Sequence, residues 1–168
     1  FILEPLTNVM NSCISTGFLP DYFKVSVVTP IHKKGSIEED DNYRPISIIP
    51  YLMKLLEILI NEQMATYFEE NNLLSELQFG FRRGLGTTDA LISLTQATYS
   101  GLDGKSKTGA LLFDLSEAFD LVDPLILLQK LAFYGFDSGS LTFFRSYLSG
   151  WRQYVDFGGE HSSMEPLA

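Results

Sequence analysis

Residues 51–70 constrain the fold most strongly, because apolar side chains recur there every three or four positions. This spacing predicts a long helix whose single apolar face has to pack against other elements. The residues on that face are Leu52, Leu55, Leu56, Leu59, Ile60, Met64 and Phe68. The same spacing predicts shorter helices over residues 2–15, 125–133 and 141–148, with Gly17 ending the first of them.

A further helix is expected to begin at residues 87–89. Thr87, Thr88 and Asp89 are all residues that can cap a helix N-terminus. The apolar residues expected on its inner side are Leu91, Leu94 and Tyr99. We expect a polar turn over residues 101–107 to follow it.

Four other stretches read as strands. Residues 25–31 are rich in β-branched side chains and are expected to form one arm of a hairpin. Residues 43–49, after a polar turn, are expected to form its returning arm or an extended piece. Residues 110–113 form a short apolar strand that ends in Asp114, and residues 155–157 are expected to form a last edge strand. Separate helices and hairpins favour an α+β fold over a doubly wound sheet.

The composition bounds the classes of protein to consider. The chain has 168 residues, 45% of them apolar, which is enough for a packed core and excludes a disordered tail. Its longest apolar runs fall far below the roughly 20 residues of a membrane span, and we expect no membrane association. The single cysteine, Cys13, excludes an internal disulfide framework and a zinc site built from several thiolates.

The charge balance argues against a free-standing nucleic-acid binder. There are 21 acidic and 12 basic residues, for a net charge of −9, so any contact with phosphates has to rest on local basic patches. Glu69, Glu70 and Glu76 are interpreted as solvent-facing residues that keep the chain soluble.

Asp114 is the first candidate for a metal ligand. A carboxylate at the end of an apolar strand lies at a sheet edge, where it can hold Mg²⁺ against a phosphate. The alternative is an aspartate that caps a helix or forms a turn. Asp120 and Asp123 are interpreted as caps of the following helix, because Pro124 stands at its first position.

A basic tract and an aromatic loop are candidates for contacts with nucleotides and nucleic acid. His32, Lys33 and Lys34 form the hairpin tip, with Lys24 and Arg44 nearby, and such donors suit a triphosphate. The alternative is a solvated tip whose lysines pair with the acidic residues 38–41.

The loop that contains Phe81, Arg82 and Arg83 is rich in glycine, which lets its backbone approach a nucleic acid closely, and an aromatic ring beside arginines can stack on a base. The alternative is a tight turn in which Phe79 and Phe81 fill the core. His32, His161 and Cys13 receive no catalytic role.

Six motifs in collinear order resemble the reverse transcriptases of non-LTR retrotransposons, in particular the jockey-like LINE elements. The resemblance runs from about residue 18 to residue 155. The motifs are NYRPIS from Asn42, KLLEILI from Lys54, LLSELQFGFRRGLGTTDAL from Leu73, LLFDLSEAFDLVDP from Leu111, LAFYGF from Leu131 and FRSYLSGWRQYV from Phe144.

The resemblance implies a right-hand polymerase fold, with fingers over residues 1–95 and the proximal palm over residues 96–168. It implies that Asp114 holds Mg²⁺ or Mn²⁺, and that the Phe119 ring is a gate against a ribose 2′-hydroxyl. It assigns triphosphate binding to Lys33 or Lys34 and to Arg44, and template binding to Gln78, Phe81, Arg82 and Arg83. The implied partners are an RNA template, a DNA primer and deoxynucleoside triphosphates, inside the cell in the cytoplasm and nucleus.

The sequence also departs from the family pattern. The Gly-Pro-Gln-Gly-Ser-like motif and the aromatic-x-Asp-Asp motif that carries further metal ligands are absent, and Glu117 stands where many relatives carry Lys. Two-metal transfer needs carboxylates on both sides of the metal pair. We therefore expect a piece of a longer polymerase that is inactive alone, and the sequence leaves its oligomeric state open.

Two alternatives to the polymerase assignment remain. One is a non-catalytic RNA-binding or interaction remnant of a decayed or domesticated element. The other is a phosphatase resembling the haloacid-dehalogenase-like enzymes, in which a second Asp follows the first by two residues. In this chain Ser116 stands at that position.

Overall fold

This computed structural model describes residues 1–115, 118–119 and 121–167. The chain divides into two compact units, one made of residues 1–60 and 122–168 and the other of residues 61–121. The predicted boundary between fingers and palm near residue 95 stays a prediction. The described residues contain helices and a small sheet, so the predicted α+β class is confirmed.

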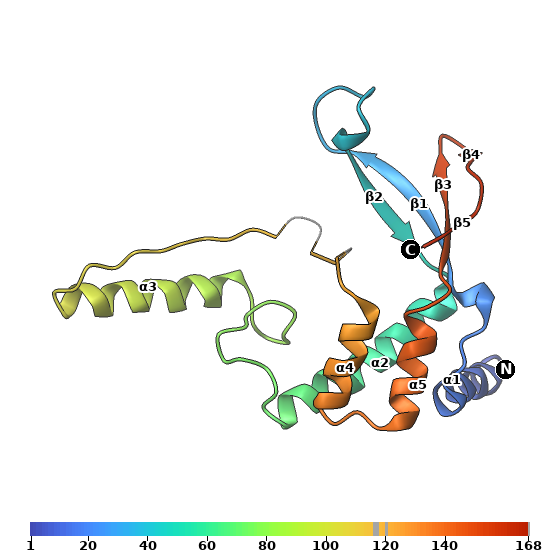
Figure 1. The fold of residues 1–168 in the computed structure, drawn as a ribbon, viewed down its shortest axis with the longest axis horizontal. Helices are drawn as coiled ribbons and strands as arrows, with labels where there is room; N and C mark the ends of the chain where they lie inside the picture. Colours follow the sequence, from blue (N-terminus) through green and yellow to red (C-terminus); the bar gives the residue numbers. More distant parts are fainter. Residues whose placement is uncertain (116–117, 120, 168) are drawn as a thin grey trace. The chain divides into compact units, whose positions relative to one another are not determined.

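A five-stranded sheet forms within the first unit (Figure 1). The strands β1 (Val25–His32) and β2 (Tyr43–Ile48) make the predicted antiparallel hairpin, with Ile31 opposite Arg44 and His32 opposite Tyr43. β3 (Arg152–Phe157) pairs in parallel with β1, and β4 (Glu160–His161) and β5 (Glu165–Pro166) pair with β3.

The expected edge position of residues 155–157 is wrong. β3 has β1 on one side and the short strands β4 and β5 on the other, so it is an inner strand of the sheet. The reason is long-range pairing, because Val25 lies opposite Arg152 and Val28 opposite Val155.

The helices of the first unit begin and end close to the predicted positions. α1 (Leu3–Thr16) ends at Gly17, whose φ of +67° is left-handed. A Cβ at Gly17 would lie 2.8 Å from the Thr142 side chain, so glycine also lets the end of α1 approach α5 (Ser138–Tyr147) closely. α2 (Tyr51–Glu70), which begins in this unit and continues into the second, has the predicted bounds, and α4 spans Pro124–Phe133.

The core of this unit is built from apolar side chains of the helices, the sheet and the segment between α1 and β1. Its buried members are Met10, Cys13, Leu19, Phe23, Val28, Met53, Leu56, Leu128, Leu131, Phe143 and Phe144. Burial raises the pKa of the Cys13 thiol, which keeps it protonated and unreactive.

Carboxylates cap the two C-terminal helices. Asp123 accepts hydrogen bonds from the backbone N–H groups of Leu125 and Ile126, with Pro124 at the first helical position, so the prediction for Asp123 is confirmed. Asp137 accepts from the N–H of Ser140 at 2.7 Å, and this bond lowers the pKa of Asp137. Asp120 lies outside the described residues.

The second unit contains the end of α2, a loop and α3 (Thr87–Asp103). The N-cap of α3 is Gly86 rather than one of residues 87–89, and the Asp89 carboxylate accepts from its N–H at 2.7 Å. Helix continues to Asp103, through the first part of the expected turn. Its expected inner residues Leu91, Leu94 and Tyr99 are exposed, and none of the residues of α3 is buried in the described part of the chain.

The strand predicted at residues 110–113 is absent. Residues 105–115 have no helix or strand, and the side chains of Leu111, Leu112 and Phe113 are exposed. A strand needs a hydrogen-bonded neighbour, and no described residue pairs with this segment.

Within the described residues, no helix is long and apolar enough to cross a membrane.

Candidate functional site

The β1–β2 hairpin carries three exposed basic side chains at its tip. Lys33 and Lys34 follow β1, and Arg44 lies on β2 opposite Ile31. None of the three makes a side-chain hydrogen bond or ion pair with any described residue. The alternative in which the lysines pair with residues 38–41 is therefore wrong in this structure, and the three charges are open to an anion.

Lys24 does not belong to this basic surface. It is only 6% exposed, and its Nζ lies 3.4 Å from the Ser146 hydroxyl on α5, to which it donates. Lys24 precedes β1 and points into the unit, whereas the hairpin tip points to solvent. The basic tract predicted from the sequence therefore loses one of its members.

Asn42 organises the turn between the two strands, a role that the sequence analysis missed. Its side-chain amide donates to the Ser36 carbonyl at 2.8 Å and to the Glu39 carboxylate at 3.0 Å. The carbonyl of Asn42 accepts from the Lys33 N–H at 2.7 Å, and the Tyr43 hydroxyl donates to the Ile37 carbonyl at 2.9 Å. These bonds hold the turn without using the basic side chains.

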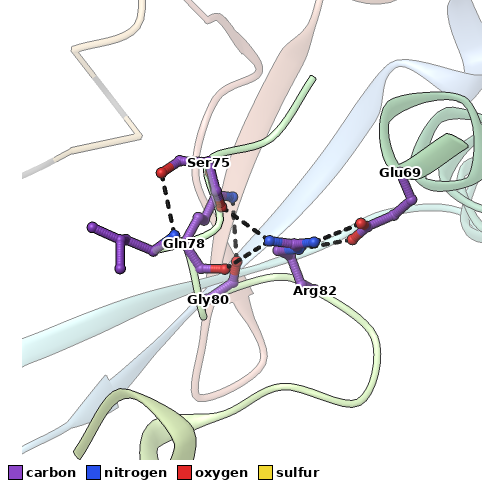
Figure 2. A network of polar contacts seen from close by, with 6 residues as sticks. Glu69, Ser75, Gln78, Gly80 and Arg82 are labelled. Atoms are coloured by element: carbon purple, nitrogen blue, oxygen red, sulfur yellow. Dashed lines mark hydrogen bonds and ion pairs between the residues drawn. The ribbon is translucent and has the colours of Figure 1, made fainter. Parts of the chain in front are cut away.

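The loop after α2 is held by the Arg82 guanidinium (Figure 2). Its Nε and Nη2 donate to the two Glu69 carboxylate oxygens at 2.8 and 2.6 Å. Its Nη1 donates to the carbonyl oxygens of Ser75 at 2.9 Å and of Gln78 at 3.4 Å. The hydrogen bonds between the two side chains, together with their opposite charges, lower the pKa of Glu69 and raise the pKa of Arg82.

The other predicted template residues have different surroundings. Phe81 is 93% exposed, so the alternative in which it fills the core is wrong. Arg83 is exposed and has no side-chain partner among the described residues. The Gln78 amide donates to the Gly80 carbonyl at 3.3 Å, inside the same loop. Glu69, interpreted as a solubilising residue, is instead the partner of Arg82.

Asp114 and Phe119 lie near the end of the second unit. Asp114 is exposed at the end of the irregular segment that follows α3. The Phe119 ring is 77% exposed and meets the Phe81 ring edge to face, with centroids 6.1 Å apart. Ser116 and Glu117, between Asp114 and Phe119 in the sequence, lie outside the described residues.

A comparison with known protein families shows which family these residues belong to. The family model for the reverse transcriptase (RNA-dependent DNA polymerase) matches residues 31–165. The chain belongs to the reverse transcriptase family. The matched range contains the hairpin tip, the loop after α2, Asp114 and Phe119.

The similarity to individual proteins points to the same family. The chain is 32% identical over 164 residues to the probable RNA-directed DNA polymerase from transposon X-element of Drosophila melanogaster, covering 97% of the chain and 18% of that protein. It is 30% identical over 167 residues to the RNA-directed DNA polymerase from mobile element jockey of the same species, covering 99% and 18%. For the probable polymerase from transposon BS the identity is 35% over 131 residues, covering 76% and 14%.

The resemblance to reverse transcriptases of jockey-like non-LTR elements is thereby confirmed. This reverse transcriptase chain spans less than a fifth of the length of the curated relatives above. The roles of single residues inherited from the family remain predictions.

Reverse transcriptases as a family depend on divalent metal ions, and Asp114 offers the hard oxygen that such ions prefer. No group of three or more His, Cys, Asp and Glu side chains in the described part of the chain is arranged to hold a metal. The described residues of this reverse transcriptase chain therefore supply one candidate ligand rather than a complete site.

Proposed function

We propose that this chain forms the fingers and proximal palm of an RNA-directed DNA polymerase of a non-LTR retrotransposon. The observation that carries the proposal is the family match over residues 31–165, which includes the basic hairpin tip and Asp114. The proposed reaction is the addition of deoxynucleotides to a DNA primer on an RNA template. It takes place inside the cell, in the cytoplasm and nucleus.

The hairpin tip is the proposed site for the triphosphate. Lys33, Lys34 and Arg44 present positive charges that no described residue neutralises, and Arg44 offers a bidentate fork to phosphate oxygens. The bonds of Asn42 fix the turn that carries them. The free cations and the fixed turn support this assignment.

Asp114 and Phe119 are the proposed palm residues. Asp114 would be one ligand of the Mg²⁺ ions, or of Mn²⁺, which neutralise phosphate charge when bound. The Phe119 ring would exclude a ribose 2′-hydroxyl by van der Waals contact and so favour deoxynucleotides. The loop of Gln78, Phe81, Arg82 and Arg83 is the proposed contact with the template strand.

Nucleotide binding by the full chain tests the hairpin assignment. We expect Arg44→Ala to weaken the binding of a fluorescent deoxynucleoside triphosphate about tenfold, because hydrogen bonds between charged groups are worth about 1.5–3 kcal/mol. Single Lys33→Ala and Lys34→Ala variants determine which lysine contributes. The measurement is a fluorescence titration of each purified variant.

Arg145→Ala is the matched control, since Arg145 is an exposed arginine of the same unit on α5. It is expected to bind the nucleotide as the unmodified chain does. Equal affinity of Arg44→Ala and Arg145→Ala would show that the hairpin tip does not hold the triphosphate.

A further inference from the structure

Two neighbouring arginines of the loop after α2 have opposite surroundings. The Arg82 side chain is 17% exposed, and all of its donor nitrogens are engaged by Glu69 and by two loop carbonyls. Arg83 is exposed and makes no side-chain bond with a described residue. The sequence gives both residues the same candidate role, whereas their contacts separate them.

The contacts of Arg82 join three points of the chain. Glu69 is in the last turn of α2, and Ser75 and Gln78 lie on the loop that follows it. We call the bidentate ion pair between the Glu69 carboxylate and the Arg82 guanidinium the Glu69–Arg82 brace. Since the same guanidinium also holds both loop carbonyls, the brace ties the loop to the end of α2 (Figure 2).

The residue directly before Arg82 has an unfavourable backbone conformation. Phe81 has a φ of +59°, a left-handed value that L residues with large side chains rarely adopt. Such a conformation persists where surrounding contacts hold it. In this loop the neighbouring Arg82 supplies those contacts, and the result is a ring that is 93% exposed.

We propose that Arg82 is a positioning residue, and that the Glu69–Arg82 brace presents Phe81 and Arg83 to a single-stranded nucleic acid. An exposed ring stacks on a base, and an unpaired guanidinium binds a phosphate. The edge-to-face contact between Phe81 and Phe119 leaves most of the Phe81 ring free, as its exposure shows. The inference rests on the proposed function, which supplies the RNA template as this ligand.

If the brace positions the loop, removing the negative charge of Glu69 changes RNA affinity in the direction opposite to the one that net charge predicts. Glu69 is acidic, so its removal should improve RNA binding if only net charge matters. If the brace positions the loop, Glu69→Gln instead weakens binding, although the chain becomes less negative. Arg82→Lys keeps the charge but loses the planar fork, so it should weaken binding as well.

The experiment measures the binding of a fluorescein-labelled 12-nucleotide single-stranded RNA to the full chain over a series of salt concentrations, with a DNA strand of the same length alongside. We expect Phe81→Ala to weaken binding about tenfold through lost stacking. Arg83→Gln is expected to weaken it and to reduce the salt slope by about 0.7, the value for one phosphate of a single strand. Glu69→Gln and Arg82→Lys are expected to weaken it on the order of tenfold, because the contacting groups lose their fixed positions, with the salt slope unchanged.

Glu70→Gln is the matched control, since Glu70 is the adjacent acid of α2 and is exposed. It should bind RNA as tightly as the unmodified chain or more tightly. Circular dichroism of each variant shows whether the helices are kept, and Arg82→Lys provides the second test if Glu69→Gln does not fold.

Three outcomes would overturn the inference, and they differ in what they imply for the proposed function. If Phe81→Ala and Arg83→Gln lose affinity while Glu69→Gln and Arg82→Lys do not, the loop is a template contact without a brace, and the proposed function stands. If the chain and every variant bind RNA equally, the loop is not a template contact. Preference for the DNA strand over RNA would assign the loop to the primer or another DNA strand and would contradict the template role.

Discussion

At the scale of single residues, the Tyr147 hydroxyl makes a polar contact within the first unit. It donates to the Glu57 carboxylate at 2.8 Å, joining α5 to α2. Burial, followed by the hydrogen bond to Glu57 and its negative charge, raises the pKa of Tyr147 well above the ordinary value near 10. The proton of this hydroxyl therefore contributes to stability.

The sign of the pH dependence follows from this shift. Because the pKa of Tyr147 is higher in the folded than in the unfolded chain, the stabilisation is complete below about pH 10 and is lost as the pH rises toward the folded value. Tyr147→Phe removes this titration and is expected to cost about 1 kcal/mol near neutral pH through the lost hydrogen bond.

Urea unfolding between pH 7 and 11 measures the effect. The free energy of unfolding of the unmodified chain should fall more steeply above pH 10 than that of Tyr147→Phe, so the difference between them shrinks. Tyr22→Phe is the control, because Tyr22 is an exposed tyrosine of the same unit. Parallel pH curves for Tyr147→Phe and the unmodified chain would contradict the assignment.

Single residues also show which side-chain surroundings the sequence does not predict. The exposed positions of Lys33, Lys34 and Arg44 agree with their polarity, but the burial of Lys24 does not. The partner of Arg82 could not be predicted either. Glu69 lies thirteen residues away, across a loop whose path has no periodic pattern.

At the scale of elements, local signals decide helix ends. The Asp123 carboxylate accepts from two N–H groups of α4 that no helical carbonyl can reach, and Pro124 fits the first position. Asp123→Ala is expected to destabilise the chain by about 1 kcal/mol, whereas Asp123→Asn should keep most of the stability, because Asn is also a good N-cap.

Thermal and urea unfolding of the two variants test this expectation. A loss for Asp123→Ala that Asp123→Asn does not share locates the effect in the cap. Equal stability of Asp123→Ala and the unmodified chain would show that the α4 terminus does not need this carboxylate.

Elements that depend on a distant neighbour were predicted less well. The hairpin, α1 and α2 agree with the sequence because spacing, Gly17 and the prolines act within a few residues. Residues 110–113 have strand composition but no paired neighbour in the described chain, so composition alone misleads. The same holds for α3, whose apolar residues predicted an inner side that the described residues do not bury.

At the scale of the whole molecule, the sheet order is the feature that the sequence leaves undetermined. β1 and β3 pair although Val25 and Arg152 stand at opposite ends of the chain, and no local pattern specifies that choice. The ordered motifs nevertheless predicted the family correctly, since six motifs in one order constrain the protein more than any single element does. For the site, the motifs place the candidate residues, and the structure separates the free cations from the braced one.

The central proposal is that the protein to which this chain belongs is an RNA-directed DNA polymerase in which Asp114 takes part in the chemistry. The most direct test is primer extension on an RNA template by the longest protein that contains this chain, since the relatives are several times longer. We expect deoxynucleotide incorporation that Asp114→Asn abolishes, and that Asp103→Asn, at the end of α3 in the same unit, leaves intact. Extension by Asp114→Asn at the unmodified rate would contradict the account.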